Sequence, residues 1–260
     1  MSAHLQVEHL SKSYGGLRAV RDVSFTLARG EILAMIGPNG AGKSTCFNML
    51  NGQLTPDAGR IRIGGQDTTG LPPRAVCRLG VGRTFQITAT FGSMTVRENV
   101  QVTLLSHRRR TNRAFGFAGR AYRDEADALL GLLGIGDAAN RPCGELAYGD
   151  LKRLELAVAL ANEPSLLFMD EPTAGMGPAE RKELMRLTAR IARECGIGVL
   201  FTEHDMDVVF GHADRIVVLD HGEIIAIGRP DEIRADPGVQ ATYLGQGLGQ
   251  QQARQSGVAP

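Results

Sequence analysis

Short apolar runs alternate along this chain with longer segments in which apolar residues recur every three or four positions. The runs, each of a length that suits a strand buried on both faces, lie at residues 31–36, 166–169 and 198–202. The helical spacing occurs between residues 95 and 133 and again at 178–195. Buried strands that alternate with helices are typical of an α/β fold with a parallel sheet.

A second kind of strand is marked by alternating apolar and polar residues, so that one face is buried and the other is exposed. This pattern occurs near the N-terminus, at residues 5–10 and 24–27. A turn at 54–59 leads into the start of a hairpin at 60–65, and a last hairpin turns at His221 and Gly222. We therefore expect a small antiparallel β subdomain beside the parallel sheet.

The helical pattern in the middle of the chain predicts a helical subdomain, at about residues 88–163, inserted into the α/β core. A basic cluster lies between its helices, and its members are Arg108, Arg109, Arg110, Arg113, Arg120 and Arg123. Two interpretations stay open: a solvated loop, or contact with anionic lipid headgroups or an acidic partner. The Gly- and Gln-rich residues 246–260 are expected to form a disordered tail.

Composition narrows the class of protein. The chain has 260 residues, of which 43% are hydrophobic, so a sizeable core can form. Its 29 basic and 28 acidic residues nearly cancel, and nothing in this balance favours a nucleic-acid partner. The four cysteines form no CxxC pair, which is typical of reduced thiols in a cytoplasmic protein. Because no apolar run approaches the ~18 residues that span a bilayer, work at a membrane would need another subunit.

The strongest chemical motif follows the first buried run directly. Residues 37–45 fit G-x-x-x-x-G-K-[ST], in which backbone N–H groups cradle phosphates. We expect Lys43 to reach the β- and γ-phosphates and the Ser44 hydroxyl to bind Mg²⁺. A helix that begins at Ser44 would turn its positive N-terminus towards the same phosphates. The candidate nucleotide-binding residues are Gly37, Pro38, Asn39, Gly40, Ala41, Gly42, Lys43, Ser44 and Thr45.

Polar residues also follow the other buried runs, where parallel strands would bring them to the edge that carries the phosphate loop. Asp170 is expected to hold Mg²⁺, directly or through water, and Glu171 to polarise the attacking water. His204 follows the strand at 198–202, where it could contact the γ-phosphate or serve a structural role. Gln86 could bind Mg²⁺, orient a water or lie on the surface, and Tyr14 could stack on adenine or pack on the small sheet.

In this order the motifs resemble the nucleotide-binding subunit of an ABC transporter, over about residues 1–245. The resemblance implies a P-loop NTPase core with ATP and Mg²⁺ as cofactors. It makes residues 37–45 the Walker A motif and residues 166–171 the Walker B motif. It also implies catalytic roles for Glu171, His204 and Gln86, metal binding by Ser44, Gln86 and Asp170, and adenine stacking by Tyr14.

Two motifs depart from the family pattern. The signature reads Leu146-Ala147-Tyr148-Gly149-Asp150 in place of Leu-Ser-Gly-Gly-Gln, so Ala147 lacks the hydroxyl expected to touch the γ-phosphate held by the opposite subunit. The backbone N–H of Gly149 and the N-terminus of the following helix, for which Gly149 and Asp150 are the expected cap, remain as anion-binding groups. Residues 172–178, where the D-loop belongs, carry Met176-Gly177 in place of the usual Leu-Asp.

Within the family, several details resemble the importers of branched-chain and other hydrophobic amino acids. They are residues 83–86, the Tyr-Gly form of the signature, residues 203–206 and the ending at 243–245. The similarity implies a second ATP-binding subunit in a dimer, transmembrane permease subunits, indirectly a solute-binding protein, and a position on the inner face of the cell membrane. Similar ATPases serve urea or amide uptake and lipopolysaccharide export, and a soluble ABC ATPase or a catalytically silent partner are the remaining alternatives.

Overall fold

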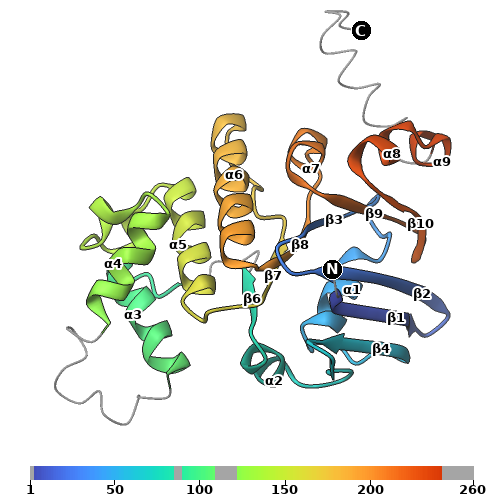
Figure 1. The fold of residues 1–260 in the computed structure, drawn as a ribbon, viewed down its shortest axis with the longest axis horizontal. Helices are drawn as coiled ribbons and strands as arrows, with labels where there is room; N and C mark the ends of the chain where they lie inside the picture. The colour runs from blue at the N-terminus through green and yellow to red at the C-terminus, as the bar shows by residue number, and fades with distance from the viewer. Residues whose placement is uncertain (1–2, 85–89, 109–121, 242–260) are drawn as a thin grey trace, which may run out of the picture.

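The computed structural model describes residues 3–84, 90–108 and 122–241, and within them the strands form two sheets (Figure 1). The larger sheet has the strand order β10 (Glu223–Gly228), β9 (Arg215–Asp220), β3 (Ile32–Ile36), β8 (Gly198–Thr202), β7 (Leu166–Asp170) and β6 (Val81–Thr84). All of its pairs are parallel except that of β9 with β10. The expected α/β core with a parallel sheet is therefore confirmed.

The smaller sheet is antiparallel and has the order β2 (Leu17–Ala28), β1 (Ala3–Tyr14), β4 (Ala58–Ile63) and β5 (Gln66–Asp67). It lies at the end of the molecule opposite the helical region in Figure 1. The β1 and β2 strands have 12 residues each, and the register between them shifts along their length. These shifts interrupt the alternation of apolar and polar residues, so the sequence shows this alternation only over parts of each strand.

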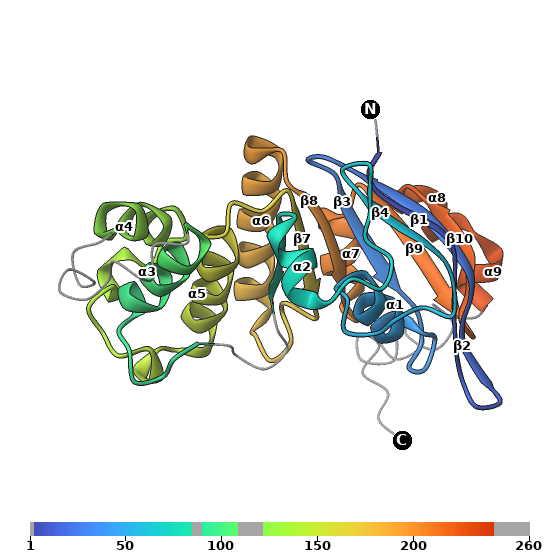
Figure 2. The ribbon, with the colours of Figure 1, turned by 90° about the horizontal axis from the view of Figure 1, so that it is seen from below.

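Helices cover both faces of the larger sheet. One face carries α1 (Lys43–Leu50), and the other carries α6 (Pro178–Cys195) and α7 (Met206–His212) (Figures 1 and 2). The apolar run of the central strand β3 is unbroken because both faces of the strand are buried. Leu33 and Met35 belong to the core around α1. Ile32, Ala34 and Ile36 belong to the core around the other helices.

The helical region at the left of Figure 1 contains α3 (Val96–His107), α4 (Arg123–Leu132) and α5 (Tyr148–Leu160). Thr95 begins α3 with a capping box: its hydroxyl accepts from the Glu98 backbone N–H, and the Glu98 carboxylate accepts from the Thr95 N–H. Two 3-10 turns, Gly136–Ala138 and Cys143–Glu145, connect α4 to α5. Of the basic cluster, Arg108 pairs with Glu125 and Glu163, and Arg123 approaches Asp127; the remaining arginines lie outside the described residues.

The structure corrects some expected boundaries. The helix after the signature has Ala147 as its N-cap, without a side-chain hydrogen bond, so the cap expected at Gly149 and Asp150 is wrong. The short helices α2 (Pro73–Arg78), α7, α8 (Pro230–Ala235) and α9 (Pro237–Val239) were not predicted. A helix of seven residues or fewer is too short to show a repeating apolar face, so pattern alone cannot identify it. The expected tail lies outside the described residues.

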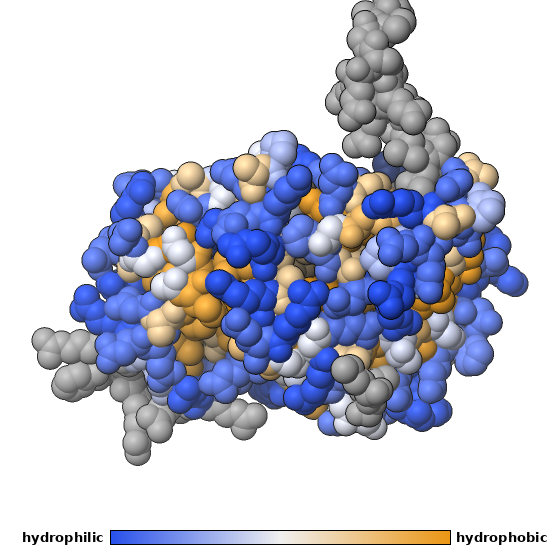
Figure 3. Space-filling model, turned by 45° about the horizontal axis from the view of Figure 1, so that its top comes forward, coloured by the Kyte–Doolittle hydropathy of each residue, from blue (hydrophilic) through white to orange (hydrophobic). Residues whose placement is uncertain are grey.

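Figure 3 shows hydrophobic side chains in separate patches between hydrophilic ones on one face of the molecule. No helix in the described part of the chain combines the length and the apolar character that crossing a lipid bilayer requires.

The contact between α1 and β7 gives a prediction about stability. The Phe168 ring on β7 is fully buried and meets the Phe47 ring of α1 edge to face, with centroids 6.1 Å apart. We expect Phe168→Ala to lower the free energy of unfolding by about 3–5 kcal/mol, because it leaves a cavity behind the phosphate loop. Chemical denaturation measures this, with Phe91→Ala as the matched control because Phe91 is 55% exposed. An equal loss in both variants would contradict the prediction.

Candidate functional site

The phosphate loop begins directly after β3 and ends in the first turn of α1. Lys43 is 8% exposed, and its ammonium group donates to the carbonyl oxygens of Gly37 and Pro38, at 2.6 and 3.1 Å. Burial lowers the pKa of Lys43, while the nearby carboxylates of Glu171 and Asp170 act in the opposite direction. The loop thus places one buried cation beside neutral acceptors, which an anion would replace favourably.

Two glycines are required by the shape of the loop. Gly37 has φ of +155°, and a Cβ built on it would lie 2.2 Å from the carbonyl oxygen of Leu219. Gly42 has φ of +102°, and its Cβ would lie 2.4 Å from the carbonyl oxygen of Ala19. Because both contacts are with backbone atoms, neither position can accept a side chain without moving the loop. The N–H groups of the loop and of the first turn of α1 are thereby left close to any phosphate bound there.

The acidic residues lie at the end of β7, held by its neighbour β8. Asp170 pairs in register with Thr202, and the Thr202 hydroxyl donates to the Asp170 carboxylate at 2.7 Å. The same hydroxyl accepts from the backbone N–H of Glu171, at 3.0 Å. One buried side chain, 1% exposed, therefore fixes both candidate acids. Glu171 itself has φ of +48°, a conformation that turns its side chain out of the strand.

The side chains of His204 and Glu171 form a close pair at the end of the sheet. The Nε2 atom of His204 lies 3.0 Å from a carboxylate oxygen of Glu171, and both side chains are partly exposed, 47% and 27% respectively. The neighbouring Glu203 is buried and accepts from the backbone N–H and the hydroxyl of Thr173, at 2.9 and 2.6 Å. These two hydrogen bonds hold the residue before His204 against the loop that contains Thr173.

The remaining predicted residues are placed as follows. Ser44 and Thr45 lie in the first turn of α1, with Ser44 exposed. Tyr14 ends β1 at the hairpin with β2 and is 50% exposed. Gly149 lies in α5, which β6 and β7 separate from the phosphate loop (Figure 1). Gln86 lies outside the described residues.

Sequence reasoning missed Thr202 and Glu203. Thr202 is the last residue of an otherwise apolar strand, and its role depends on the register between β7 and β8. Glu203 stands beside His204, and only its partner Thr173, 30 residues away, shows that it holds a loop. Residues 203–206 stood out for their resemblance to the family, but the partners of Glu203 and Thr202 lie 30 and 32 positions away, so no signal along the chain could have identified the roles of these two residues.

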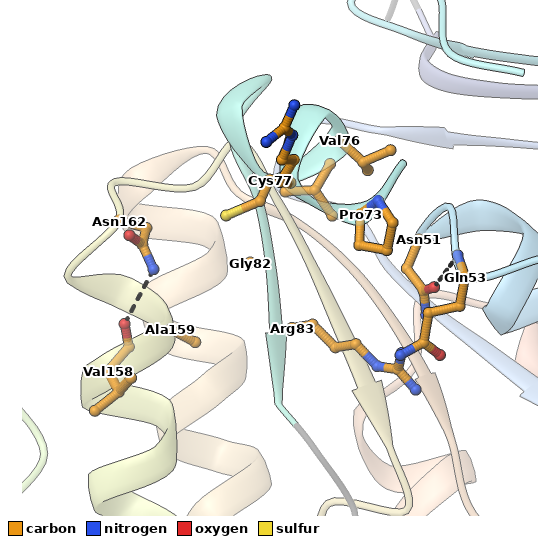
Figure 4. A pocket seen from close by; sticks show the side chains of 12 residues that line it. Asn51, Gln53, Pro73, Val76, Cys77, Gly82, Arg83, Val158, Ala159 and Asn162 are labelled. Carbon is orange, nitrogen blue, oxygen red and sulfur yellow. Dashed lines mark hydrogen bonds between the residues drawn. The ribbon is translucent and has the colours of Figure 1, made fainter. Parts of the chain in front are cut away.

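A pocket of about 310 Å³ lies beside β6 (Figure 4). Its walls come from the end of α1, from α2, from β6 and from the C-terminal turn of α5. Figure 4 shows Arg83 extending from β6 towards Asn51 and Gln53, while Cys77 lies at the α2 wall. The pocket contains no residue of the phosphate loop, so it is a separate surface.

A phosphate loop between a central parallel strand and a helix, with carboxylates at the ends of the same sheet, defines a P-loop nucleoside triphosphatase. The family described as ABC transporter matches residues 20–174, and the chain belongs to this family. It is an ATPase subunit of the ABC type. A second family, described as branched-chain amino acid ATP-binding cassette transporter, matches residues 223–248.

Named relatives are similar over nearly the whole chain. The high-affinity branched-chain amino acid transport ATP-binding protein LivG of Salmonella typhimurium is 42% identical over 250 residues, which are 93% of this chain and 98% of LivG. The corresponding protein BraF of Pseudomonas aeruginosa is 40% identical, with the same coverage.

Solved structures agree with the fold. The ADP conformation of MJ1267, an ATP-binding cassette of an ABC transporter, has a TM-score of 0.83 and 31% identity, and the match covers 94% of this chain and all of that one. A dimeric post-hydrolysis state of the cassette MJ0796 bound to ADP and phosphate has a TM-score of 0.72 and 25% identity, and covers 87% of this chain and 98% of that one.

The hydroxyl of Thr202 gives a testable prediction. Thr202→Val keeps the shape of the side chain but removes the hydrogen bonds to Asp170 and Glu171. We expect the ATPase turnover to fall roughly tenfold or more, since a hydrogen bond to a charged group is worth about 1.5–3 kcal/mol. Steady-state ATPase assays measure this loss. Thr188→Val is the control, because the Thr188 hydroxyl is equally buried but bonds only to the carbonyl of Leu184 in α6. Unchanged turnover in Thr202→Val would contradict the assignment.

Proposed function

We propose that this chain is the ATP-hydrolysing subunit of an importer for branched-chain or other hydrophobic amino acids. The cargo is supported by the relatives LivG and BraF and by the match of residues 223–248. ATP hydrolysis is supported by one observation: the Glu171 carboxylate lies 3.0 Å from Nε2 of His204 and, together with Asp170, acts on the buried Lys43. Within the cassette of residues 1–245, residues of about 88–163 form the helical subdomain.

ATP fits the residues of the phosphate loop. On binding, the Lys43 ammonium would exchange the carbonyl oxygens of Gly37 and Pro38 for the β- and γ-phosphates, which restores a charged partner to a buried cation. The backbone N–H groups of the loop between Asn39 and Thr45 would hold the remaining phosphate oxygens. Tyr14, exposed at the end of β1, is available to stack on the adenine.

Magnesium fits the same edge. Ser44, Asp170 and Gln86 offer hydroxyl, carboxylate and amide oxygens, which are the ligands that Mg²⁺ prefers. When bound, the ion would neutralise the charge that develops on the phosphates. Thr202 keeps the Asp170 carboxylate pointed at this edge.

Glu171 is the proposed general base. Its carboxylate would accept a proton from the attacking water, and His204 would hold the carboxylate in place and contact the γ-phosphate. Gln86 is the residue that we assign to orienting the attacking water, on the basis of the sequence motif. The partial exposure of both Glu171 and His204 leaves room for a water and for the surface of a second subunit.

The second ATP-binding subunit would complete the site. In this chain the signature residues Ala147 and Gly149 lie on α5, away from the chain's own phosphate loop, so they can serve only the nucleotide of a partner. Ala147 supplies no hydroxyl, and the N–H groups at the start of α5 are the groups left to bind the γ-phosphate. Closure of the dimer around ATP, followed by hydrolysis, would drive transport.

The pocket beside β6 is the proposed contact for a permease subunit. Its lining combines apolar residues, among them Val76, Val81 and Val158, with the cations Arg74 and Arg83. Burial lowers the pKa of Arg83, and the nearby Asp170 acts in the opposite direction. An amphipathic permease segment fits the mixed apolar and basic lining. Such a contact would hold the ATPase at the inner face of the membrane, with the solute-binding protein on the far side.

The assignment of the base is tested by Glu171→Gln. We expect turnover to fall by about 10²–10⁴-fold, because the amide cannot accept the proton from water, while ATP binding and ATP-dependent dimer formation persist. ATPase assays and size-exclusion chromatography with ATP and Mg²⁺ measure these quantities. Glu194→Gln, an exposed position on α6, is the control and keeps full activity. Normal hydrolysis by Glu171→Gln would discard the assignment.

The proposed permease contact is tested by chemical modification of the exposed cysteine thiols. Cys77, which lines the pocket, and Cys195 are exposed, whereas Cys46 and Cys143 are buried and burial raises the pKa of the Cys46 thiol to about 12. A bulky maleimide is therefore expected to modify Cys77 and Cys195 alone, and to prevent assembly with the permease. Cys77→Ser should assemble after the same treatment, and Cys195→Ser should remain sensitive. Assembly of the wild type with both thiols modified would refute the contact.

A further inference from the structure

The loop of residues 172–178, between β7 and α6, is tied at two points to the segment that carries His204. At its start, the Thr173 hydroxyl and backbone N–H donate to the carboxylate of Glu203. Further along, the Met176 carbonyl oxygen accepts a hydrogen bond from Nε of Arg181 at 2.7 Å. The other end of the same guanidinium donates to the Asp205 carboxylate, also at 2.7 Å. Glu203 and Asp205 flank His204, so both ties end beside the same histidine.

Asp205 is well suited to hold Arg181. One of its oxygens caps α7 by accepting from the N–H groups of Asp207 and Val208, which leaves the other oxygen for the guanidinium. The two charged side chains are only 30% and 28% exposed, so solvent screens the pair less than a surface pair. The geometry is therefore that of a fixed bridge between the loop and the first turn of α7.

The same loop supports the signature of its own chain. A Cβ built on Gly175, where φ is +80°, would lie 3.2 Å from the Tyr148 ring, so the ring rests directly on the loop backbone. At Gly149 a Cβ would lie 3.2 Å from the Glu180 carboxylate and 3.8 Å from the Met176 side chain. That carboxylate also accepts from the N–H of Gly177 at 3.0 Å. The start of α5 and the loop are thus packed as one surface.

Behind the Tyr148 ring, the packing continues into a buried ion pair. The Lys152 ammonium lies 5.5 Å from the ring centroid and 3.1 Å from the Glu155 carboxylate, and both charged side chains are almost fully buried. The ring therefore contacts both Lys152 and the backbone at Gly175. A displacement of the loop at Gly175 must move Tyr148 or open this contact.

We propose that Arg181 is a positioning residue that couples the His204–Glu171 pair of this chain to its own signature, which faces the nucleotide of the partner subunit. The coupling runs from Asp205 through the guanidinium to the Met176 carbonyl, and from Gly175 to Tyr148. The consequence of this coupling rests on the proposed function. A change at the nucleotide bound by this chain would alter the signature surface that the chain offers to the nucleotide of the partner subunit.

The bridge is tested first without nucleotide, by hydrogen–deuterium exchange of the full chain. In Arg181→Met we expect at least about tenfold faster exchange at Met176 N–H, which bonds to Thr173, and at Leu151 N–H, which bonds to Ala147 at the start of α5. Amides of β7 and β8 should be unchanged, which separates loss of the bridge from loss of the fold. Arg186→Met is the matched control, because Arg186 also lies on α6 but pairs only with the exposed Glu183. Unchanged exchange at Leu151 in Arg181→Met would overturn the proposal.

The second test uses the chain assembled with its partner and permease subunits. Arg181→Met should lower kcat about tenfold and change the KM for ATP less than twofold, because the nucleotide contacts remain. Asp205→Asn, which keeps the cap of α7, should have the same effect, and the double variant should be no worse than either single one. Additive losses, or a kcat equal to that of Arg186→Met, would refute the coupling. If the wild type and Arg186→Met themselves hydrolyse no ATP, the proposed function fails, and the exchange result still decides whether the bridge exists.

Discussion

The burial of one positive charge is the constraint on which the rest of this structure depends. Lys43 is held at the end of the central strand, where its hydrogen-bond partners among the described residues are carbonyl oxygens, and burial lowers its pKa although Glu171 and Asp170 act in the opposite direction. A cation in such a place costs free energy unless an anion joins it. The glycines at 37 and 42 exist because the loop must approach other backbone segments to reach this position. The fold is thereby prepared for phosphate before any ligand arrives.

The parallel sheet brings the opposing charges to the same edge. Asp170 and Thr202 end neighbouring strands in register, and the next residues, Glu171 and Glu203, begin the loops that hold His204 and Thr173. A shift of one residue between β7 and β8 would turn the Thr202 hydroxyl to the other face and separate it from both acids. Precision at the site therefore comes from strand register, supported by the two apolar cores on either side of β3.

The proposed division of the site between two subunits is consistent with the fold. The signature lies at the start of α5, while the phosphate loop lies beyond β6 and β7. The loop between β7 and α6 contacts the start of α5 through Tyr148, and Arg181 and Asp205 join it to the segment that carries His204.

The α/β class, the phosphate loop, the acids at 170 and 171 and His204 could be predicted from the sequence, because each depends on a contiguous motif or on apolar runs a few residues long. The contacts of Thr202, Glu203 and Arg181, the pocket beside β6 and the short helices became visible only in the folded chain. The reason is physical. A strand or a phosphate loop is specified by neighbouring residues, whereas hydrogen bonds between residues 24 to 32 positions apart arise only when packing brings their strands and loops together.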